Sequence, residues 1–573
     1  MRGKMFTQRN KILIINKNDT AMKSLLQNIK RTSSLFLVTL LIISCSESYL
    51  DRETYGDKDA IRQDQFDNLD NRLDGTMRGI YAKMYEYGGS HETFGKRSID
   101  MYGDICAGDM ALTAYNFGQF YSDESLQTNT DRAGYIWNLM YSMLHNTNDL
   151  IRSIRSNTVL MNRLAVATID SVDTYSSEDI KVIHYLAQAY AMRAYAHQTL
   201  LTWFCPPTQD ILHHPVYNYT WDNYPTFPIH TEENIDESVG YVSLRAAYNI
   251  IESDLKNSIR IFTLIDGKVA RSSKITVDIN VCRALLAWSY LNKADSKADP
   301  SSADYKDSYT EALKYAEQVI NSGAYSIIPQ NRVLHNGFND INNDSWMWGQ
   351  DVTSESTTNL ATFFGQVDIH TYSYAWAGDT KAIDRQLYSE IPSWDIRRLW
   401  FRADTPDDVF ALCPDGKYFS QKNEYSTKSE DVDREWLSDN VWLRIEAVYL
   451  MAAEAACRLG NNALAVQYLT AITDLRVNSS GLAAAADYAT WKSALSADAL
   501  LDAIKLNWRV ELWGEGYAWQ TFRRLSTFVV RGSNHAFRPG ETIDKSSNPG
   551  SAIADDYFCL VIPPDEIQYN PNL

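Results

Sequence analysis

The sequence predicts a mostly α-helical protein in which tetratricopeptide-like helix pairs pack into a superhelix, with a large loop-rich insert and few short strands. Two observations predict this fold class. Apolar residues recur every three or four positions over long stretches, as at Ile183, Ala187 and Tyr190, which is the spacing of one helix face. That periodicity is lost from residue 329 to residue 440, where Asn, Asp, Ser and aromatic residues dominate. A loop-rich segment of this length inside a globular chain is usually functional.

The first half of the chain predicts three long helices, at 66–85, 135–153 and 181–203. Small residues in the third of these helices allow close packing against its neighbours. Pro206-Pro207 ends that helix, because proline lacks the backbone N–H that a helix interior needs. We expect loops at 99–121, where no apolar stripe persists, and at 207–240, which is rich in Pro, Tyr, His and Asn.

The second half predicts further helices on both sides of the insert. Gly323 fits the end of one of them, since glycine adopts the left-handed conformation of a helix C-terminus. A stripe of Leu501, Ile504, Trp508 and Leu512 marks another, and Gly514-Glu515-Gly516 interrupts it. The expected helices are 244–262, 277–293, 309–322, 441–459, 463–475 and 500–513.

The N-terminal region reads as an export signal that ends at a lipid-modified cysteine. Residues 35–43 form an apolar run, which is too short for a bilayer span of about 20 residues but suits a signal peptide with basic residues before it. Ile42-Ile43-Ser44-Cys45 looks like a bacterial lipobox, in which the cysteine is acylated and becomes the first mature residue. An ordinary signal peptide with a chance cysteine is the alternative. We expect translation to start at Met22, which gives a signal of ordinary length.

Composition excludes some classes of partner. The chain is 45% hydrophobic and 22% charged, as a globular protein is. Its net charge is −18, and eight of its basic residues precede residue 45, so the mature part is more acidic still. This argues against nucleic acid, whose phosphates need basic patches, and against attachment through anionic lipid. The six cysteines after Cys45 show neither metal-ligand nor redox spacing.

The aromatic residues of the insert are the candidate ligand-binding site. In an extended segment, Tyr372, Tyr374 and Trp376 would share one face, and small neighbours leave the rings accessible. Burial of that face in the core is the alternative. Aromatic faces stack on sugar rings, while amides and carboxylates bind the hydroxyls. Trp346 and Trp348 also alternate, but they look more like a buried strand. The full set of expected ligand-binding residues is Trp376, Tyr374, Tyr372, Phe364, Tyr115 and Phe117.

The sequence contains no common catalytic or metal motif. It has no His-Glu-x-x-His, no zinc-spaced Cys/His cluster, no P-loop and no Gly-x-Ser-x-Gly. Glu446 and Glu454 allow a glycosidase reading, because two carboxylates hydrolyse glycosides. We expect instead that they hold helices together with Arg444 and Arg509 through charge-assisted hydrogen bonds. We predict no catalytic residues, no metal and no cofactor.

Short motifs along the mature chain resemble those of a known family. In the first part they are Tyr49-Leu50-Asp51 after Cys45; Trp137, Tyr141, Leu144 and Asn148; Ala187-Gln188-Ala189 with Arg193-Ala194; Arg245, Tyr248, Ile251, Asp254 and Leu255; and Ala312, Ala316, Ile320, Gly323 and Tyr325. In the last part they are Leu443 to Ala455; Arg509, Glu511, Leu512, Glu515, Gly516, Trp519, Arg523 and Arg524; and Ile562-Pro563 with Asn570 to Leu573. Together they resemble the SusD/RagB family of lipid-anchored nutrient-binding proteins of Bacteroidetes outer membranes. Gln188, Asn507 and Thr521 depart from the family pattern.

The resemblance implies a cell-surface lipoprotein of the outer membrane that binds a glycan and delivers it to a SusC-like TonB-dependent transporter. A lipid-anchored glycoside hydrolase and a helical-repeat scaffold that binds only protein are the alternatives. The resemblance does not indicate which glycan or peptide is bound. The expected organisation is a signal peptide at 1–44, an N-terminal helical region at 45–240, a helical repeat region at 241–328, the aromatic insert at 329–440 and a C-terminal helical region at 441–573.

Overall fold

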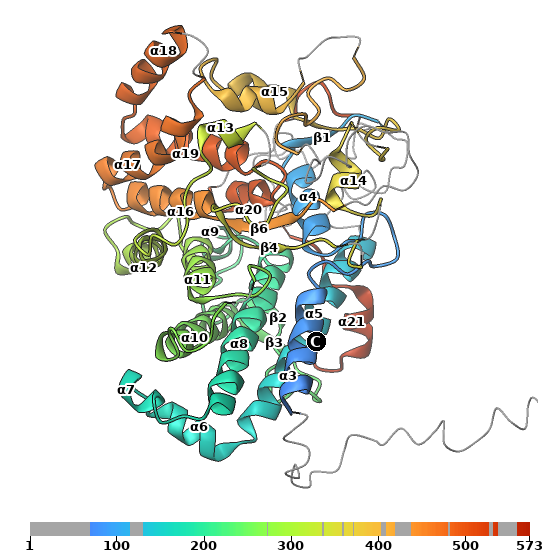
Figure 1. The fold of residues 1–573 in the computed structure, drawn as a ribbon, viewed down its shortest axis with the longest axis vertical. Helices are drawn as coiled ribbons and strands as arrows, with labels where there is room; N and C mark the ends of the chain where they lie inside the picture. Colours follow the sequence, from blue (N-terminus) through green and yellow to red (C-terminus); the bar gives the residue numbers. More distant parts are fainter. Residues whose placement is uncertain are drawn as a thin grey trace, which may run out of the picture. The chain divides into compact units, whose positions relative to one another are not determined.

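The computed structural model describes residues 69–114, 130–271, 273–334, 337–353, 355–357, 360–370, 372–402, 408–418, 437–478, 482–525, 531–536 and 559–573. All of them belong to one compact unit, which begins at Asn68. Helices make up most of it, and three two-stranded sheets lie among the described residues (Figure 1). The predicted fold class, mostly helical with few short strands, is confirmed. None of the helices in these ranges is both long and apolar enough to cross a bilayer.

The long helices pack as successive neighbours. In the chain order α5, α8, α10, α11, α12, α16 and α17, each helix packs against the next, and α3 packs on α5 and α8 (Figure 1). Ala187, Ala191 and Ala194 of α8 are fully buried, so small side chains let the neighbouring helices approach closely. The bounds are α3 Leu69–Ala82, α5 Thr130–Arg155, α8 Ser177–Phe204, α10 Leu244–Leu264, α11 Ile279–Lys293, α12 Ala303–Ile320, α16 Ile445–Arg458, α17 Asn462–Thr473 and α19 Ala497–Glu511.

Shorter elements connect and cover this stack. The short helices are α6 Thr158–Ala165, α7 Ile169–Val172, α9 Thr208–Leu212, α13 Gln330–Val333, α14 Phe363–Val367, α15 Arg385–Glu390, η3 Ile396–Trp400, η5 Asp474–Arg476, α18 Leu482–Ser493, α20 Tyr517–Arg524 and α21 Pro564–Tyr569. The antiparallel strand pairs are β1 Met110–Leu112 with β5 Lys381–Ile383, β2 Pro225–Pro228 with β3 Tyr241–Ser243, and β4 Trp346–Gln350 with β6 Asn440–Arg444.

The expectation of a loop at 99–121 is wrong for the part that the structure describes. Helix α4 (Lys96–Cys106) and strand β1 occupy it. Nearly every residue of α4 is buried, including Arg97 and Asp104. The helix is short, and its buried polar residues Arg97, Asp100 and Asp104 stand between the apolar ones. The segment therefore lacks the solvated polar face by which a surface helix is recognised in a sequence. The 207–240 segment is largely irregular as predicted, although it contains α9 and β2.

Trp346 and Trp348 form a buried strand, as predicted. Strand β4 pairs with β6, and the two indoles are 0% and 1% exposed. Each indole N–H donates to a backbone carbonyl, Trp346 to Gly337 at 3.0 Å and Trp348 to Ile275 at 2.8 Å. The predicted helix at 441–459 is therefore shorter than expected, because residues 440–444 belong to β6 and α16 starts at Ile445.

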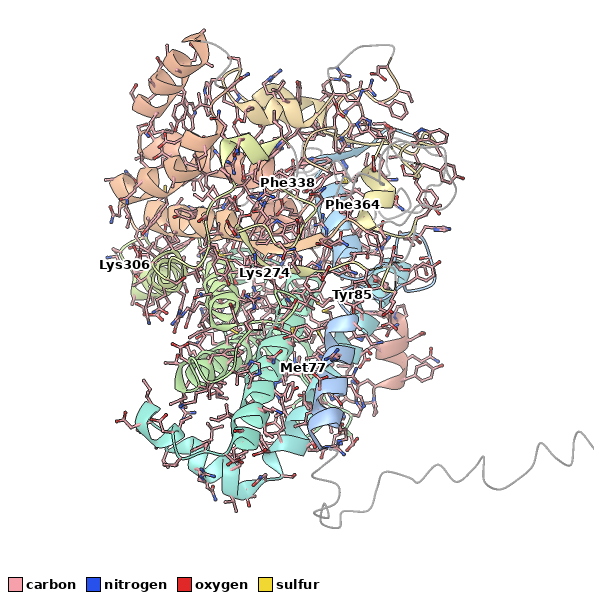
Figure 2. All side chains as sticks on the ribbon, viewed as in Figure 1. Met77, Tyr85, Lys274, Lys306, Phe338 and Phe364 are labelled. Atoms are coloured by element: carbon pink, nitrogen blue, oxygen red, sulfur yellow. The ribbon has the colours of Figure 1, made fainter. Side chains whose placement is uncertain are left out.

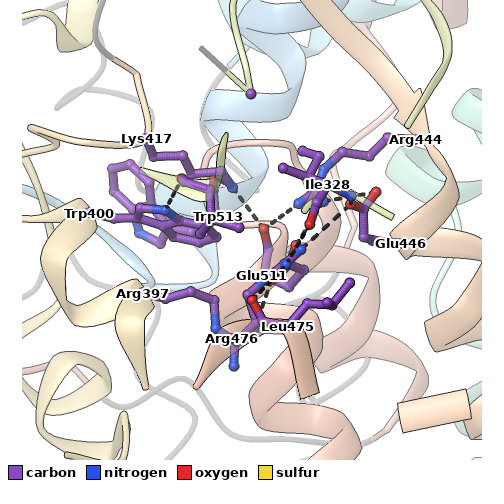
Figure 3. Close-up of polar contacts among 12 residues, drawn as sticks. Ile328, Arg397, Trp400, Lys417, Arg444, Glu446, Leu475, Arg476, Glu511 and Trp513 are labelled. Atoms are coloured by element: carbon purple, nitrogen blue, oxygen red, sulfur yellow. Dashed lines mark hydrogen bonds and ion pairs between the residues drawn. The ribbon is translucent and has the colours of Figure 1, made fainter. Parts of the chain in front are cut away.

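A buried ion network joins the insert to the C-terminal helices (Figure 3). At its centre the Glu511 carboxylate accepts hydrogen bonds from Arg397 at 3.0 Å, Arg444 at 2.8 Å and Arg476 at 2.7 Å. All four side chains are at most 2% exposed. Burial opposes the charged form, but Arg476 and Arg444 hold the pKa of Glu511 well below its usual range.

Glu515 and Gly516 explain one of the sequence motifs. Glu515 accepts hydrogen bonds from Arg444 at 2.9 Å and from Lys417 at 2.8 Å. Gly516 adopts a φ of 80°, and a Cβ there would lie 2.6 Å from the Cα of Asp100. The turn between α19 and α20 therefore needs an acid followed by a residue without a side chain.

The structural role predicted for Glu446, Glu454, Arg444 and Arg509 is confirmed. Glu446 lies 3.1 Å from Arg444, and its other oxygen accepts from the backbone N–H of Ile328 at 2.7 Å. Glu454 accepts from Arg524 at 2.6 Å and from the Trp508 indole at 2.8 Å. Arg509 donates to Asp109 at 2.6 Å.

Glu511→Ala should unfold the protein at markedly lower denaturant. Removing the central carboxylate leaves three buried guanidinium groups without their shared partner, which costs about 3–5 kcal/mol. Urea denaturation followed by circular dichroism measures the loss. Glu311→Ala is the matched control, because Glu311 forms only an exposed pair with Lys314. A loss for Glu511→Ala no larger than that of the control would contradict a central role for the network.

His197→Leu should reduce the loss of stability in acid. The imidazole is 0% exposed, and neither nitrogen has a hydrogen-bond partner among the described residues. Burial, together with the charge of Arg193, holds its pKa well below the ordinary value of 6.5. Below about pH 6.5 the unfolded chain binds a proton at this site that the folded chain does not. The free energy of unfolding therefore decreases as the pH is lowered.

Thermal denaturation between pH 7 and pH 4 tests this, with exposed His145→Leu as control. We expect His197→Leu to lose less stability than wild type over that range, with little change at pH 7. An unchanged acid slope would refute the assignment.

Candidate functional site

Exposed aromatic rings gather on a turn of the insert and on the loop that follows α3. We call Tyr87, Tyr372, Tyr374 and Trp376 the aromatic surface. Tyr372 is 55% exposed, Trp376 48% and Tyr87 45%, which is unusual for such large rings. The Tyr372 and Trp376 ring centroids lie 5.5 Å apart with their planes tilted by 55°. Two large apolar faces are therefore held together in water.

The backbone under these rings is tightly bonded. The Tyr374 N–H donates to the carbonyl of Gly365 at 3.0 Å, and the Asp379 N–H donates to the carbonyl of Tyr374 at 2.9 Å. The Ser373 hydroxyl accepts from the Trp376 N–H at 2.9 Å. Ser373 and Ala375 are buried between the exposed rings. These bonds fix the turn, so little order has to be gained when a ligand binds.

This geometry corrects the expectation of an extended segment with three rings on one face. Residues 374–378 form a turn, not a strand. Tyr372 and Trp376 meet because they stand four residues apart, whereas Tyr374 lies half-buried between them in the sequence. Its hydroxyl lies 2.6 Å from His91 Nδ1, and the two rings are 4.9 Å apart.

The Tyr374–His91 contact brings the loop after α3 to the turn. Burial raises the pKa of Tyr374, and the neighbouring hydroxyls of Tyr87 and Tyr372 raise it further. The Gln366 amide of α14 donates to the carbonyl of His91 at 3.1 Å. Two segments nearly 300 residues apart in sequence thus form one surface. The sequence analysis did not select Tyr87 or His91 as ligand-binding residues. The only indication in the sequence is that Tyr87 is an aromatic residue in a short glycine-rich segment.

The other expected site residues are placed differently. Phe364, labelled in Figure 2, is 3% exposed and contacts the Phe363 and Tyr418 rings. It belongs to the same buried cluster as Ala375 of the turn and does not offer a face to solvent. Tyr115, Phe117 and Cys45 lie outside the described residues.

The charged groups near the turn are structural. Lys381 is 1% exposed and donates to Asp379 at 2.7 Å and to Gln366 at 2.8 Å. His370 is in contact with Asp415. Within the described ranges, no three His, Cys, Asp or Glu residues are placed to hold a metal ion. The arrangement therefore suits binding through apolar faces and hydrogen bonds.

The carboxylates considered for hydrolysis are not available to a substrate. Glu446 and Glu454 are both 0% exposed and engaged by arginines. A glycosidase needs two carboxyl groups that face the sugar from either side. These two side chains serve the packing of α16 instead.

Comparisons with known proteins agree with the fold. A family described as the SusD family matches residues 290–573, and one described as starch-binding associating with outer membrane matches residues 48–277. None of the curated proteins compared matches the chain. Solved structures match at low identity, which shows the fold alone.

Three of these structures come from species of Bacteroides and Parabacteroides. A SusD-like carbohydrate binding protein from Bacteroides vulgatus has 20% identity and a TM-score of 0.63, covering 88% of this chain and 97% of its own. A SusD superfamily protein from Bacteroides thetaiotaomicron has 19% identity and a TM-score of 0.64, covering 88% and 98%. One from Parabacteroides distasonis has 15% identity and a TM-score of 0.56, covering 90% and 99%. With the two family matches spanning nearly all of the chain after residue 47, the chain belongs to the SusD family.

Proposed function

We propose that the protein is an outer-membrane surface lipoprotein that binds a glycan on the aromatic surface and delivers it to a SusC-like TonB-dependent transporter. One observation carries the binding step: Tyr372 and Trp376 are half-exposed on a turn whose backbone is fixed. The matched family is described as starch-binding and associated with the outer membrane. The Bacteroides vulgatus structure is named a carbohydrate binding protein.

The shape of the aromatic surface favours a sugar chain over a flat ligand. The apolar C–H face of a sugar ring stacks on Tyr or Trp, which carry a polar edge as well. Because the Tyr372 and Trp376 planes are tilted by 55°, a flat molecule cannot stack on both rings, whereas a bent chain can place successive rings on them. The Tyr372 hydroxyl and the Trp376 indole N–H are then available to sugar hydroxyls.

The lipobox-like sequence supports the proposed location. Cys45 in Ile42-Ile43-Ser44-Cys45 follows a signal-like apolar run. The acidic net charge gives the protein no electrostatic attraction to anionic lipid. Acyl chains supply attachment instead, at about 0.8 kcal/mol for each buried CH₂ group.

Two alternative functions predict different experimental results. A glycoside hydrolase would release products from host or plant glycans on incubation, and the burial of Glu446 and Glu454 argues against that reading. A protein-binding scaffold would be retained by a transporter pull-down while failing every glycan in an affinity screen.

Trp376→Ala should weaken glycan binding by about tenfold or more. Truncating a central aromatic contact typically costs about 2 kcal/mol or more, and 1.4 kcal/mol corresponds to a factor of ten. A glycan array selects the ligand, and calorimetry on the selected glycan measures the affinity. Tyr569→Ala is the matched control, since Tyr569 is 75% exposed on α21. Equal affinities of wild type and Trp376→Ala would rule out this site.

Cys45→Ala should release the protein from the membrane fraction. The substitution removes the thiol that carries the acyl chains, so metabolic labelling with a palmitate analogue should also be lost. Fractionation and labelling of cells that express each variant measure both effects. Cys559→Ala provides the control, because it removes a cysteine that is only partly buried and lies far from Cys45 in the sequence. Continued labelling of Cys45→Ala would show that the anchor lies elsewhere.

A further inference from the structure

A second candidate site shares no residue with the aromatic surface. It is a cavity of about 80 Å³ between α4, α8, α11, β4, β6, α16 and the start of α20. Seven of its lining residues are aromatic. Trp203 stacks on Trp519 at 5.4 Å, and Tyr195 meets Trp348 edge-on at 5.5 Å. Residues at its rim, among them Thr199 and Gln520, are only half-buried, so the cavity reaches the surface there.

Two polar side chains in the cavity wall have unmet hydrogen-bonding capacity. Gln198 is 6% exposed, and neither its amide nitrogen nor its amide oxygen has a partner among the described residues. The Trp442 indole N–H is also without a partner there, in a side chain that is 3% exposed. A buried polar group left unpaired costs about 1–3 kcal/mol. The wall therefore offers two donor groups, the Gln198 amide NH₂ and the Trp442 indole N–H, and one acceptor, the Gln198 amide oxygen.

The charges around the cavity are already balanced. Lys96 lies 2.7 Å from Asp100, and Arg97 also reaches that carboxylate at 3.3 Å. Glu515 is paired with Arg444 and Lys417. An ion entering the cavity would meet no unpaired counter-charge and would lose its hydration, which is costly. The occupant is therefore a neutral group.

The size of the cavity narrows the choice of neutral group. A cavity of about 150 Å³ takes benzene, which has six heavy atoms, so 80 Å³ encloses about three or four. A hydroxymethyl arm has two heavy atoms and would leave part of this volume empty. An acetamido group is of the right size: its carbonyl can accept from Trp442 or Gln198, its N–H can donate to the Gln198 oxygen, and its methyl group can pack on the indoles.

We propose that this cavity binds the acetamido group of an N-acetylated sugar, whose ring lies at the rim. Gln198 provides the amide that pairs with the acetamido N–H, and the Trp442 indole N–H donates to its carbonyl. The aromatic walls exclude water around the methyl group. The site is independent of the aromatic surface, because no residue belongs to both.

The test is a saturation-transfer NMR titration of the full chain in detergent with N-acetylglucosamine and with glucose. N-acetylglucosamine should bind saturably, and glucose should bind at least tenfold more weakly. Gln198→Leu removes both amide atoms at similar volume and should weaken N-acetylglucosamine binding about tenfold. Trp442→Phe keeps an aromatic ring, removes the N–H and should weaken it about threefold or more.

Two controls separate this site from general effects. Gln467→Leu changes an exposed glutamine of α17 and should leave binding unchanged. Repeating the titration with Trp376→Ala introduced into wild type and into each cavity variant removes binding at the aromatic surface, so any preference for N-acetylglucosamine over glucose that remains belongs to the cavity. Should Gln198→Leu fail to fold, as judged by circular dichroism, Trp442→Phe still decides the question. Equal binding of glucose, unchanged binding in the cavity variants, no saturable binding, or a crystal structure with only water in the cavity overturns the proposal.

Discussion

The carboxylate of Glu511 is the point on which the architecture depends. It stands at the end of α19 and receives arginines from three other elements: Arg397 from η3 of the insert, Arg444 from β6 and Arg476 from η5. A fully buried charge is tolerated only when it is paired and hydrogen-bonded. The packing of four segments is thus tied to one group, and a displaced segment would leave a charge unpaired. Such networks add little net stability over apolar packing; here their contribution is to fix which segments meet.

The ion network around Glu511 holds the irregular insert in place, so that part of the insert can form a binding surface. The insert has few regular elements, yet its core residues, including Trp400 and Phe363, are fully buried together with Trp513 of the C-terminal region. Because this buried cluster stabilises the insert, Tyr372 and Trp376 of the 372–378 turn can be exposed to solvent while the rest of the insert stays folded. Preorganisation of this kind lowers the entropy cost of binding. The stack of helices therefore positions the site, while the loops provide its chemistry.

The sequence predicts those parts of the structure that depend on residues close together in the chain. The long helices follow from their apolar spacing. The structural roles of Glu446 and Glu454 follow from their place as charged residues in an otherwise apolar helix, where they need charged partners. Helix α4 escapes prediction because its polar residues are buried by partners remote in sequence: Asp104 accepts from the backbone of Gly516 and Ala518. The cavity beside Gln198 could not be predicted from the sequence either, since its walls come from seven helices and strands.

The aromatic residues show where local rules stop. Trp346-x-Trp348 and Tyr374-x-Trp376 have the same spacing, and both follow small or polar residues. The first pair is buried because β6 supplies a partner strand and carbonyls accept both indole N–H groups. The second lies on a turn closed by its own backbone hydrogen bonds, so no strand covers Trp376. Exposure of an aromatic ring is thus decided by whether a remote segment covers it, and only the folded chain reveals which rings are left to bind a ligand.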